Sequence, residues 1–111
     1  MSDVQQRIDE LVKGHRVVLF MKGTAQFPMC GFSGRAMQIL KACGVTDLTT
    51  VNVLVDEGIR QGIKEYANWP TIPQLYIKGE FIGGCDIVRD ADGRWKVLED
   101  KRRAGERILF E

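Results

Sequence analysis

The run Val17-Val18-Leu19-Phe20-Met21 and, after a short loop, the tetrapeptide Cys30-Gly31-Phe32-Ser33 decide how this chain folds and where its chemistry lies. Five successive apolar residues predict a buried strand, and the tetrapeptide lies where that strand passes into a helix. The first N–H groups of a helix lack partners within the helix, and the helix dipole adds partial positive charge. Both effects stabilise a thiolate, so Cys30 is expected to be a nucleophile or a metal ligand near neutral pH.

Ser33 stands where a C-x-x-C redox motif would place a second thiol. Cys30 therefore cannot form a disulfide within its own motif, and its sulfur needs a partner from elsewhere. Two less specific interpretations are common: a free cysteine is often a buried core residue, and a serine in a first helical turn often satisfies backbone N–H groups. Pro28 and Gly31 place Cys30 in a turn, whereas Cys43 lies on the apolar face of a helix and is interpreted as a packing residue.

Apolar periodicity and turn residues predict the remaining elements. Helices are expected at residues 2–14, 32–44 and 56–66, and strands at 48–53, 74–77 and 81–82, with a hairpin turn at Lys78-Gly79-Glu80. The resulting order is α-β-α-β-α-β-β. Strands separated by a helix predict a parallel pair joined by a right-handed crossover, and the final hairpin adds antiparallel strands. We expect a single α/β domain over residues 1–111, without repeats or linkers.

The composition of the chain indicates which kinds of partner it can bind and in which compartment it is expected. A chain of 111 residues has room for a single core, and its net charge of +1 argues against nucleic acid or a membrane surface as a partner. Its three cysteines have no regular spacing, which excludes a secreted disulfide framework. The N-terminus lacks an export signal, and Asp3 and Asp9 argue against a transit peptide. We expect a reducing compartment, the bacterial cytoplasm by default, with the mitochondrial matrix compatible if a presequence has been trimmed.

Lys22 and the segment Thr71-Ile72-Pro73 are two further candidates for the site. A lysine directly after a strand is usually solvated, but close to Cys30 it would lower the thiol pKa or bind a carboxylate. If the Ile72–Pro73 bond is cis and faces Cys30, the backbone of Ile72 is turned toward a ligand as an edge for strand-like pairing. The alternative is a rigid turn without a binding role.

The third candidate element is Gly83-Gly84-Cys85-Asp86. The two glycines allow positive φ or close backbone approach, and Asp86 could cap a following helix. A helix start with exposed N–H groups there would bind a small anionic group. Cys85 is either a buried filler or a second thiol near the site.

Four separated stretches together resemble the monothiol glutaredoxins of the CGFS class: Met21-Lys22-Gly23, Cys30-Gly31-Phe32-Ser33, Asn68-Trp69-Pro70-Thr71-Ile72-Pro73-Gln74-Leu75 and Gly83-Gly84-Cys85-Asp86. The resemblance runs from about Val4 to Val88. It implies a thioredoxin-like fold with a central mixed four-stranded sheet flanked by helices, glutathione as ligand, and a [2Fe-2S] cluster bridged between two molecules. It further implies heterodimers with BolA-like proteins and delivery of clusters to apo iron–sulfur proteins.

The resemblance also assigns roles to individual residues. Cys30 corresponds to the cluster ligand and catalytic thiol, Lys22 and Arg60 to the pair that holds the glycine carboxylate of glutathione, and Ile72 to the backbone that pairs with its cysteinyl part. Cys85 and Asp86 correspond to the residues that hold the γ-glutamyl end. The complete glutathione-binding set implied in this way is Lys22, Arg60, Thr71, Ile72, Pro73, Gly84, Cys85 and Asp86. The chain departs from the family pattern over residues 89–111.

The number of thiolates that a [2Fe-2S] cluster needs agrees with the homodimer that the resemblance implies. A [2Fe-2S] cluster takes four thiolate ligands, and one chain with one bound glutathione supplies two of them. A homodimer with two glutathiones completes the set, which suits a carrier that must release its cargo. The rival hypothesis is a glutathione-dependent thiol–disulfide oxidoreductase in which Cys30 attacks a protein–glutathione mixed disulfide. A third is a thioredoxin-fold interaction module with an idle cysteine.

Overall fold

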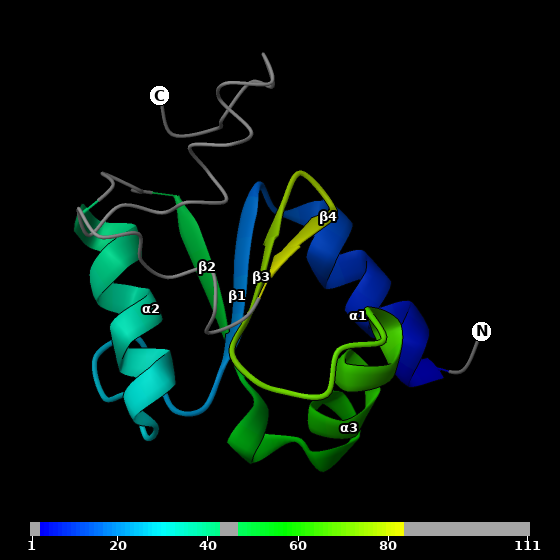
Figure 1. Ribbon diagram of the computed structural model, residues 1–111. Coiled ribbons are helices and arrows are strands. Elements are labelled where there is room, and N and C mark those ends of the chain that lie inside the picture. Colours follow the sequence, from blue (N-terminus) through cyan, green and yellow to red (C-terminus); the bar gives the residue numbers. More distant parts are fainter. Residues whose placement is uncertain (1–2, 43–46, 84–111) are drawn as a thin grey trace.

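A computed structural model describes residues 3–42 and 47–83 of the chain. The elements, in order, are α1 (Asp3–Gly14), β1 (Val17–Met21), α2 (Gly31–Ala42), β2 (Leu48–Asn52), the 3₁₀ turn η1 (Val53–Val55), α3 (Glu57–Tyr66), β3 (Gln74–Ile77) and β4 (Glu80–Gly83) (Figure 1). This order confirms the predicted one. Cys43, Gly84, Cys85, Asp86 and the segment 89–111 lie outside the described residues.

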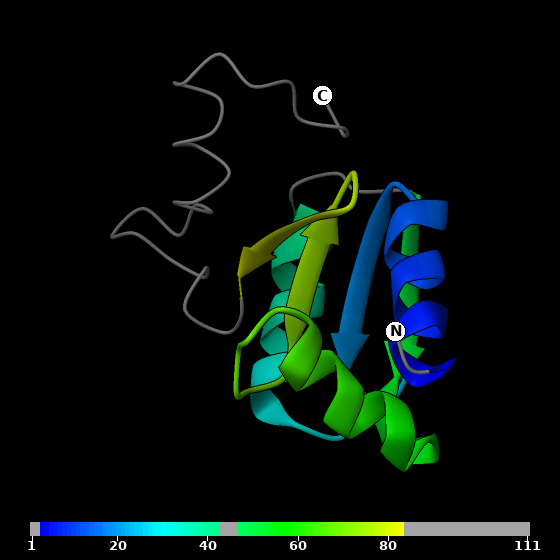
Figure 2. The ribbon, with the colours of Figure 1, turned by 90° about the vertical axis from the view of Figure 1, so that its right-hand side faces the viewer.

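The four strands form one mixed sheet in the order β2-β1-β3-β4. As predicted, β1 and β2 are parallel, whereas β3 is antiparallel to β1, and β4 is antiparallel to β3. Figure 2 shows α1 and α3 in front of the sheet and α2 behind it. Because β1 and β2 run in the same direction, their carboxyl ends meet at one edge of the sheet, where the loop after β1 and the turn η1 lie (Figure 1).

All five residues of β1 are buried, because both faces of the strand are covered. Successive side chains of a strand point to opposite faces. One set packs toward α2 in a cluster of Val17, Leu19, Met21, Ala36, Met37, Leu40, Leu75 and Ile77. The other set packs toward α1 and α3 with Ile8, Val12, Val18, Phe20, Val53, Ile59, Ile63, Ile72 and Tyr76. The strand that leads into the Cys30 loop therefore lies between two apolar layers.

Two element boundaries show how side chains end strands and start helices. The strand predicted to reach Val53 ends at Asn52, because the Asn52 side chain caps η1 by accepting a hydrogen bond from the Leu54 N–H. Asp56 likewise caps α3 through the Ile59 N–H. The β3–β4 hairpin turns through Lys78 and Gly79, which both have positive φ, as expected for a two-residue primed turn. Over the described part of the chain, no helix is long and apolar enough to cross a membrane.

The burial of β1 generates a prediction for stability. Leu19→Ala removes buried methyl groups from the layer beneath α2, and we expect the free energy of unfolding to fall by about 2–5 kcal/mol. Val55→Ala is the matched control, since Val55 is 80% exposed, and its effect should stay within about 0.5 kcal/mol. Urea denaturation of the two variants measures the difference, and equal effects would contradict the two-layer core.

Candidate functional site

Cys30 directly precedes α2, and its carbonyl accepts the helix's first hydrogen bond, from the Gly34 N–H at 2.9 Å. The side chain is half-buried, and the thiol is free. The backbone N–H of Ser33 holds the pKa of the Cys30 thiol below its ordinary value. Burial opposes this lowering, while the Phe32 N–H, the charge of Lys22 and the Ser33 hydroxyl reinforce it. This direction agrees with the one expected for a thiol at a helix start.

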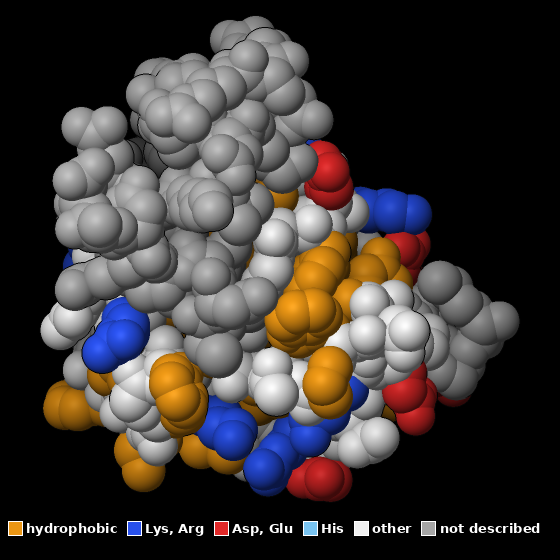
Figure 3. Space-filling view, viewed as in Figure 1, with side chains coloured by type: hydrophobic (Ala, Val, Ile, Leu, Met, Phe, Trp, Pro, Cys, Tyr) orange, Lys and Arg blue, Asp and Glu red, His pale blue; other side chains and the backbone are white. Residues whose placement is uncertain are grey.

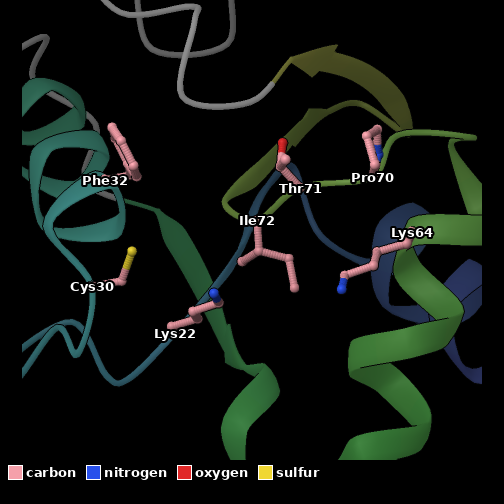
Figure 4. A pocket seen from close by; sticks show the side chains of 7 residues that line it. All are labelled: Lys22, Cys30, Phe32, Lys64, Pro70, Thr71 and Ile72. Carbon is pink, nitrogen blue, oxygen red and sulfur yellow. The ribbon is translucent and has the colours of Figure 1, made fainter.

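The thiol opens onto a pocket of about 330 Å³, a volume that suits a small-molecule ligand. Seven residues line it: Lys22, Cys30, Phe32, Lys64, Pro70, Thr71 and Ile72. Figure 4 shows Cys30 and Phe32 on one side, Lys64 of α3 on the other, and Ile72 between them. The end of β1, the start of α2, α3 and the segment before β3 therefore converge on one ligand-sized space.

The structure brings together four of the site residues expected from the sequence: Lys22, Cys30, Thr71 and Ile72. Pro73 is buried, and the Ile72–Pro73 bond is cis, as considered from the sequence. Arg60 does not line the pocket. It lies on α3, where its guanidinium is 3.9 Å from the Glu57 carboxylate. Gly84, Cys85 and Asp86 lie outside the described residues, so their predicted roles stay predictions.

Lys64, Phe32 and Pro70 line the pocket but were not assigned to it from the sequence. Lys64 follows Arg60 by four residues, so both lie on one face of α3, and this spacing is the signal that could have identified it. Within residues 3–42 and 47–83, neither Lys22 nor Lys64 has an ion-pair partner. The pocket thus contains two uncompensated cations, which favour an anionic ligand.

Ser33 fixes the distance between the strand and the helix that carry the site. It is fully buried, and its hydroxyl accepts a hydrogen bond from the Lys22 N–H at 3.1 Å. A serine that satisfies a backbone N–H was among the interpretations of the sequence, but the N–H belongs to Lys22, the residue after β1, rather than to α2. The residue that replaces a second thiol therefore connects Lys22 to the helix start beneath Cys30.

Gly23 allows the loop between Lys22 and Cys30 to close. Its φ is +96°, and a Cβ at this position would lie 2.5 Å from both the Met29 nitrogen and the Phe27 carbonyl oxygen. The loop is closed by a hydrogen bond from the Met29 N–H to the Lys22 carbonyl at 2.9 Å. Only glycine combines this backbone conformation with this close approach.

Gln74 holds the opposite wall of the pocket. Its buried amide nitrogen donates to the Trp69 and Thr71 carbonyls at 3.0 and 3.2 Å, and its oxygen accepts from the Tyr76 hydroxyl at 2.8 Å. The first residue of β3 thereby fixes the segment that presents Thr71 and Ile72 to the pocket. Every polar atom of the buried Gln74 side chain has a partner, which favours a rigid arrangement.

The chemistry available is that of a thiol of lowered pKa facing two lysines. Among the described residues, no group of three or more histidine, cysteine or acidic side chains could hold a metal ion. Cys30 is the only cysteine within the described ranges. A metal centre of several thiolates at this position would therefore need ligands from outside residues 3–42 and 47–83.

The sequence profile of the glutaredoxin family matches residues 17–82, a range that begins with β1 and includes Cys30 and all other residues lining the pocket. The chain belongs to the glutaredoxin family.

Relatives of this glutaredoxin include glutaredoxin-related protein 5, mitochondrial, of Danio rerio, 48% identical over 91% of this chain and 65% of that protein. A monothiol glutaredoxin of Synechocystis is 55% identical over 78% of this chain and 79% of that one. The solution structure of reduced poplar apo GrxS14 is 47% identical, with a TM-score of 0.65, over 93% of this chain and 84% of that chain. The thioredoxin-like glutaredoxin fold and the monothiol class expected from the sequence are thus confirmed. The chain spans 58 to 65% of the length of three curated relatives that it matches.

The lowered pKa of Cys30 predicts its reaction with iodoacetamide as a function of pH. Because the thiolate is the reactive form, alkylation should rise through a midpoint below the value of about 8.5 for a free cysteine. Lys22→Met removes a nearby positive charge and should move that midpoint upward. Lys41→Met, at the opposite end of α2, is the control and should leave it unchanged. A wild-type midpoint at or above the ordinary value would contradict this description of the site.

Gly23→Ala should disrupt the Cys30 loop, because the added methyl group meets backbone atoms in a conformation that L residues rarely adopt. We expect a loss of about 1–3 kcal/mol of stability and faster exchange of the Met29 amide hydrogen. Gly14→Ala is the control, since a Cβ there meets nothing within 4 Å. Thermal unfolding and amide exchange of both variants test the difference, and a stable Gly23→Ala variant with an unchanged Met29 amide would refute it.

Proposed function

We propose that this glutaredoxin binds glutathione in the pocket beside Cys30 and carries a [2Fe-2S] cluster as cargo between two copies of the chain. The observation that supports this most is a thiol of lowered pKa facing a pocket with two lysines that have no ion-pair partner among residues 3–42 and 47–83. Glutathione is an anionic tripeptide whose thiol would lie near Cys30 while a carboxylate lies near the lysines. Charge-assisted hydrogen bonds of this kind are among the stronger polar contacts.

The glycine carboxylate has three candidate partners. Lys22 and Lys64 line the pocket, and Arg60 lies one helical turn before Lys64. The pair that Arg60 makes with Glu57 is long and lies at the surface, so it contributes little and leaves the guanidinium available to a ligand. The backbone of Ile72 offers an edge for the cysteinyl part of glutathione, and we keep Gly84, Cys85 and Asp86 as the proposed partners of its γ-glutamyl end.

The dimer follows from the count of thiolates and is favoured by the surface around Cys30. Two chains and two glutathiones supply the four thiolates that the cluster takes. Large apolar side chains are exposed beside the thiol, with Phe27 at 76%, Met29 at 70% and Phe32 at 58%. Figure 3 shows apolar side chains beside a group of Lys and Arg side chains at this end of the molecule. Exposed apolar surface next to a site is typical of a protein contact.

The family resemblance extends the proposal to partners and compartment. BolA-like proteins would replace one copy in a heterodimer, and apo iron–sulfur proteins would receive the cluster. Thiolate ligands persist in a reducing environment, so we propose the bacterial cytoplasm or the mitochondrial matrix as the place of action.

An oxidoreductase is the second candidate, because the same accessible thiolate could attack a protein–glutathione mixed disulfide. The Cys30 sulfur would bond to the sulfur of glutathione, and the protein thiolate would leave. A second glutathione thiolate would then attack the Cys30–glutathione disulfide, regenerate Cys30 and leave as oxidised glutathione. Ser33 permits this route, since it needs one protein thiol.

Anaerobic reconstitution with iron, sulfide and glutathione tests the proposal. We expect a coloured dimer, measured by visible absorption and native mass, that is lost in Cys30→Ser and when glutathione is omitted. Lys41→Met should behave as the wild type. A colourless monomer with rapid deglutathionylation would favour the oxidoreductase, and a protein inactive in both assays would favour an interaction module.

A further inference from the structure

We infer that Asn52 is a positioning residue of the glutathione pocket, because its side-chain oxygen fixes the backbone from which Lys22 reaches into the pocket. This inference rests on the proposed binding of glutathione. Asn52 is the last residue of β2 and pairs with Met21, the last residue of β1. It therefore lies on the strand next to the site and belongs to none of the motifs that identify the family.

The Asn52 side-chain oxygen accepts two hydrogen bonds. One comes from the Gly23 N–H and the other from the Leu54 N–H, both at 3.0 Å. A carboxamide oxygen has two lone pairs, so its accepting capacity is used completely. The Leu54 bond caps η1, whereas the Gly23 bond crosses to the loop that follows β1. One atom thus connects the end of β2, the turn η1 and the loop that carries Cys30.

Three backbone groups around Lys22 are held by three different segments. The Lys22 N–H donates to Ser33 of α2, the Lys22 carbonyl accepts from the Met29 N–H, and the next N–H, that of Gly23, donates to Asn52. The peptide groups on both sides of the Lys22 Cα are fixed in this way. The direction in which its side chain leaves the strand is set before a ligand arrives, so less freedom is lost on binding.

Asparagine suits this position better than the other residues that cap a turn. Serine can cap the Leu54 N–H two residues on, but its shorter side chain does not extend to Gly23. Aspartate could accept both bonds, but its charge would lie close to Lys22 and compete with an anionic ligand. Asn52→Ser therefore separates the two bonds, because it keeps the cap and removes the link to the loop.

The test is a ¹⁵N NMR titration of the full chain with reduced glutathione, combined with exchange of the Gly23 amide hydrogen in the free protein. We expect Asn52→Ser and Asn52→Ala to weaken glutathione binding about threefold to tenfold, the range that follows from losing one hydrogen bond of ordinary net strength. The Gly23 amide should exchange faster in both variants. Asn52→Ser should unfold at a higher temperature than Asn52→Ala, since it keeps the cap. Thr50→Ala, two residues earlier on β2, is the control and should leave glutathione binding and Gly23 amide exchange unchanged.

A double-mutant cycle with Lys22→Met distinguishes positioning from a general structural effect. If Asn52 acts through Lys22, Asn52→Ser should not weaken binding further once Lys22 is replaced. Additive losses would overturn the inference, as would wild-type affinity in Asn52→Ser while Lys22→Met binds weakly. If the wild type binds no glutathione, the proposed function fails and the inference fails with it. If the wild type binds and only the cycle is additive, the proposed function stands and the inference alone is refuted.

Discussion

The burial of β1 between two apolar layers is the constraint on which the rest of the structure depends. Its five side chains are shared between the layer beneath α2 and the layer beneath α1 and α3. The strand cannot shift its register by one residue without exchanging these two sets of side chains. Its carboxyl end is consequently fixed in space, and Lys22 and the Cys30 loop begin from that fixed point.

Side-chain hydrogen bonds from three residues position the site relative to the fixed end of β1. The Ser33 and Asn52 side chains accept hydrogen bonds from the Lys22 and Gly23 N–H groups, which follow β1. Gln74 holds the facing wall by donating hydrogen bonds to the Trp69 and Thr71 carbonyls. Between these supports the lining itself consists of the Cys30 thiol, two lysines, a threonine and apolar groups. Ser33 and Gln74 are buried and hydrogen-bonded, whereas Lys22 and Lys64 have no ion-pair partner among residues 3–42 and 47–83, as expected of a preorganised site.

Much of the fold could be predicted from the sequence, because the decisive patterns are local. Five apolar residues in a row identified β1, and the position of Cys30 before a periodic helix predicted its lowered pKa. The end of β2 was placed one residue too late, since Asn52 caps a 3₁₀ turn that apolar alternation does not reveal. Lys64 lies four residues after Arg60 on α3, but which of the two side chains lines the pocket depends on how α3 packs. The hydrogen bond between Asn52 and Gly23 joins residues 29 positions apart, so no local sequence pattern around either residue predicts it.

The hydrogen bonds of Gln74 restrict which residues can occupy this position in the pocket wall. Both hydrogens of its amide are committed to main-chain carbonyls, and its oxygen is committed to Tyr76. A glutamate there has almost the same shape and volume, yet an ionised carboxylate carries no hydrogen to donate. Its oxygens would face the Trp69 and Thr71 carbonyl oxygens, and repulsion between like partial charges would push the wall outward. Glutamine and glutamate therefore differ at this position through the two amide hydrogens that bind the Trp69 and Thr71 carbonyls, and not through their size.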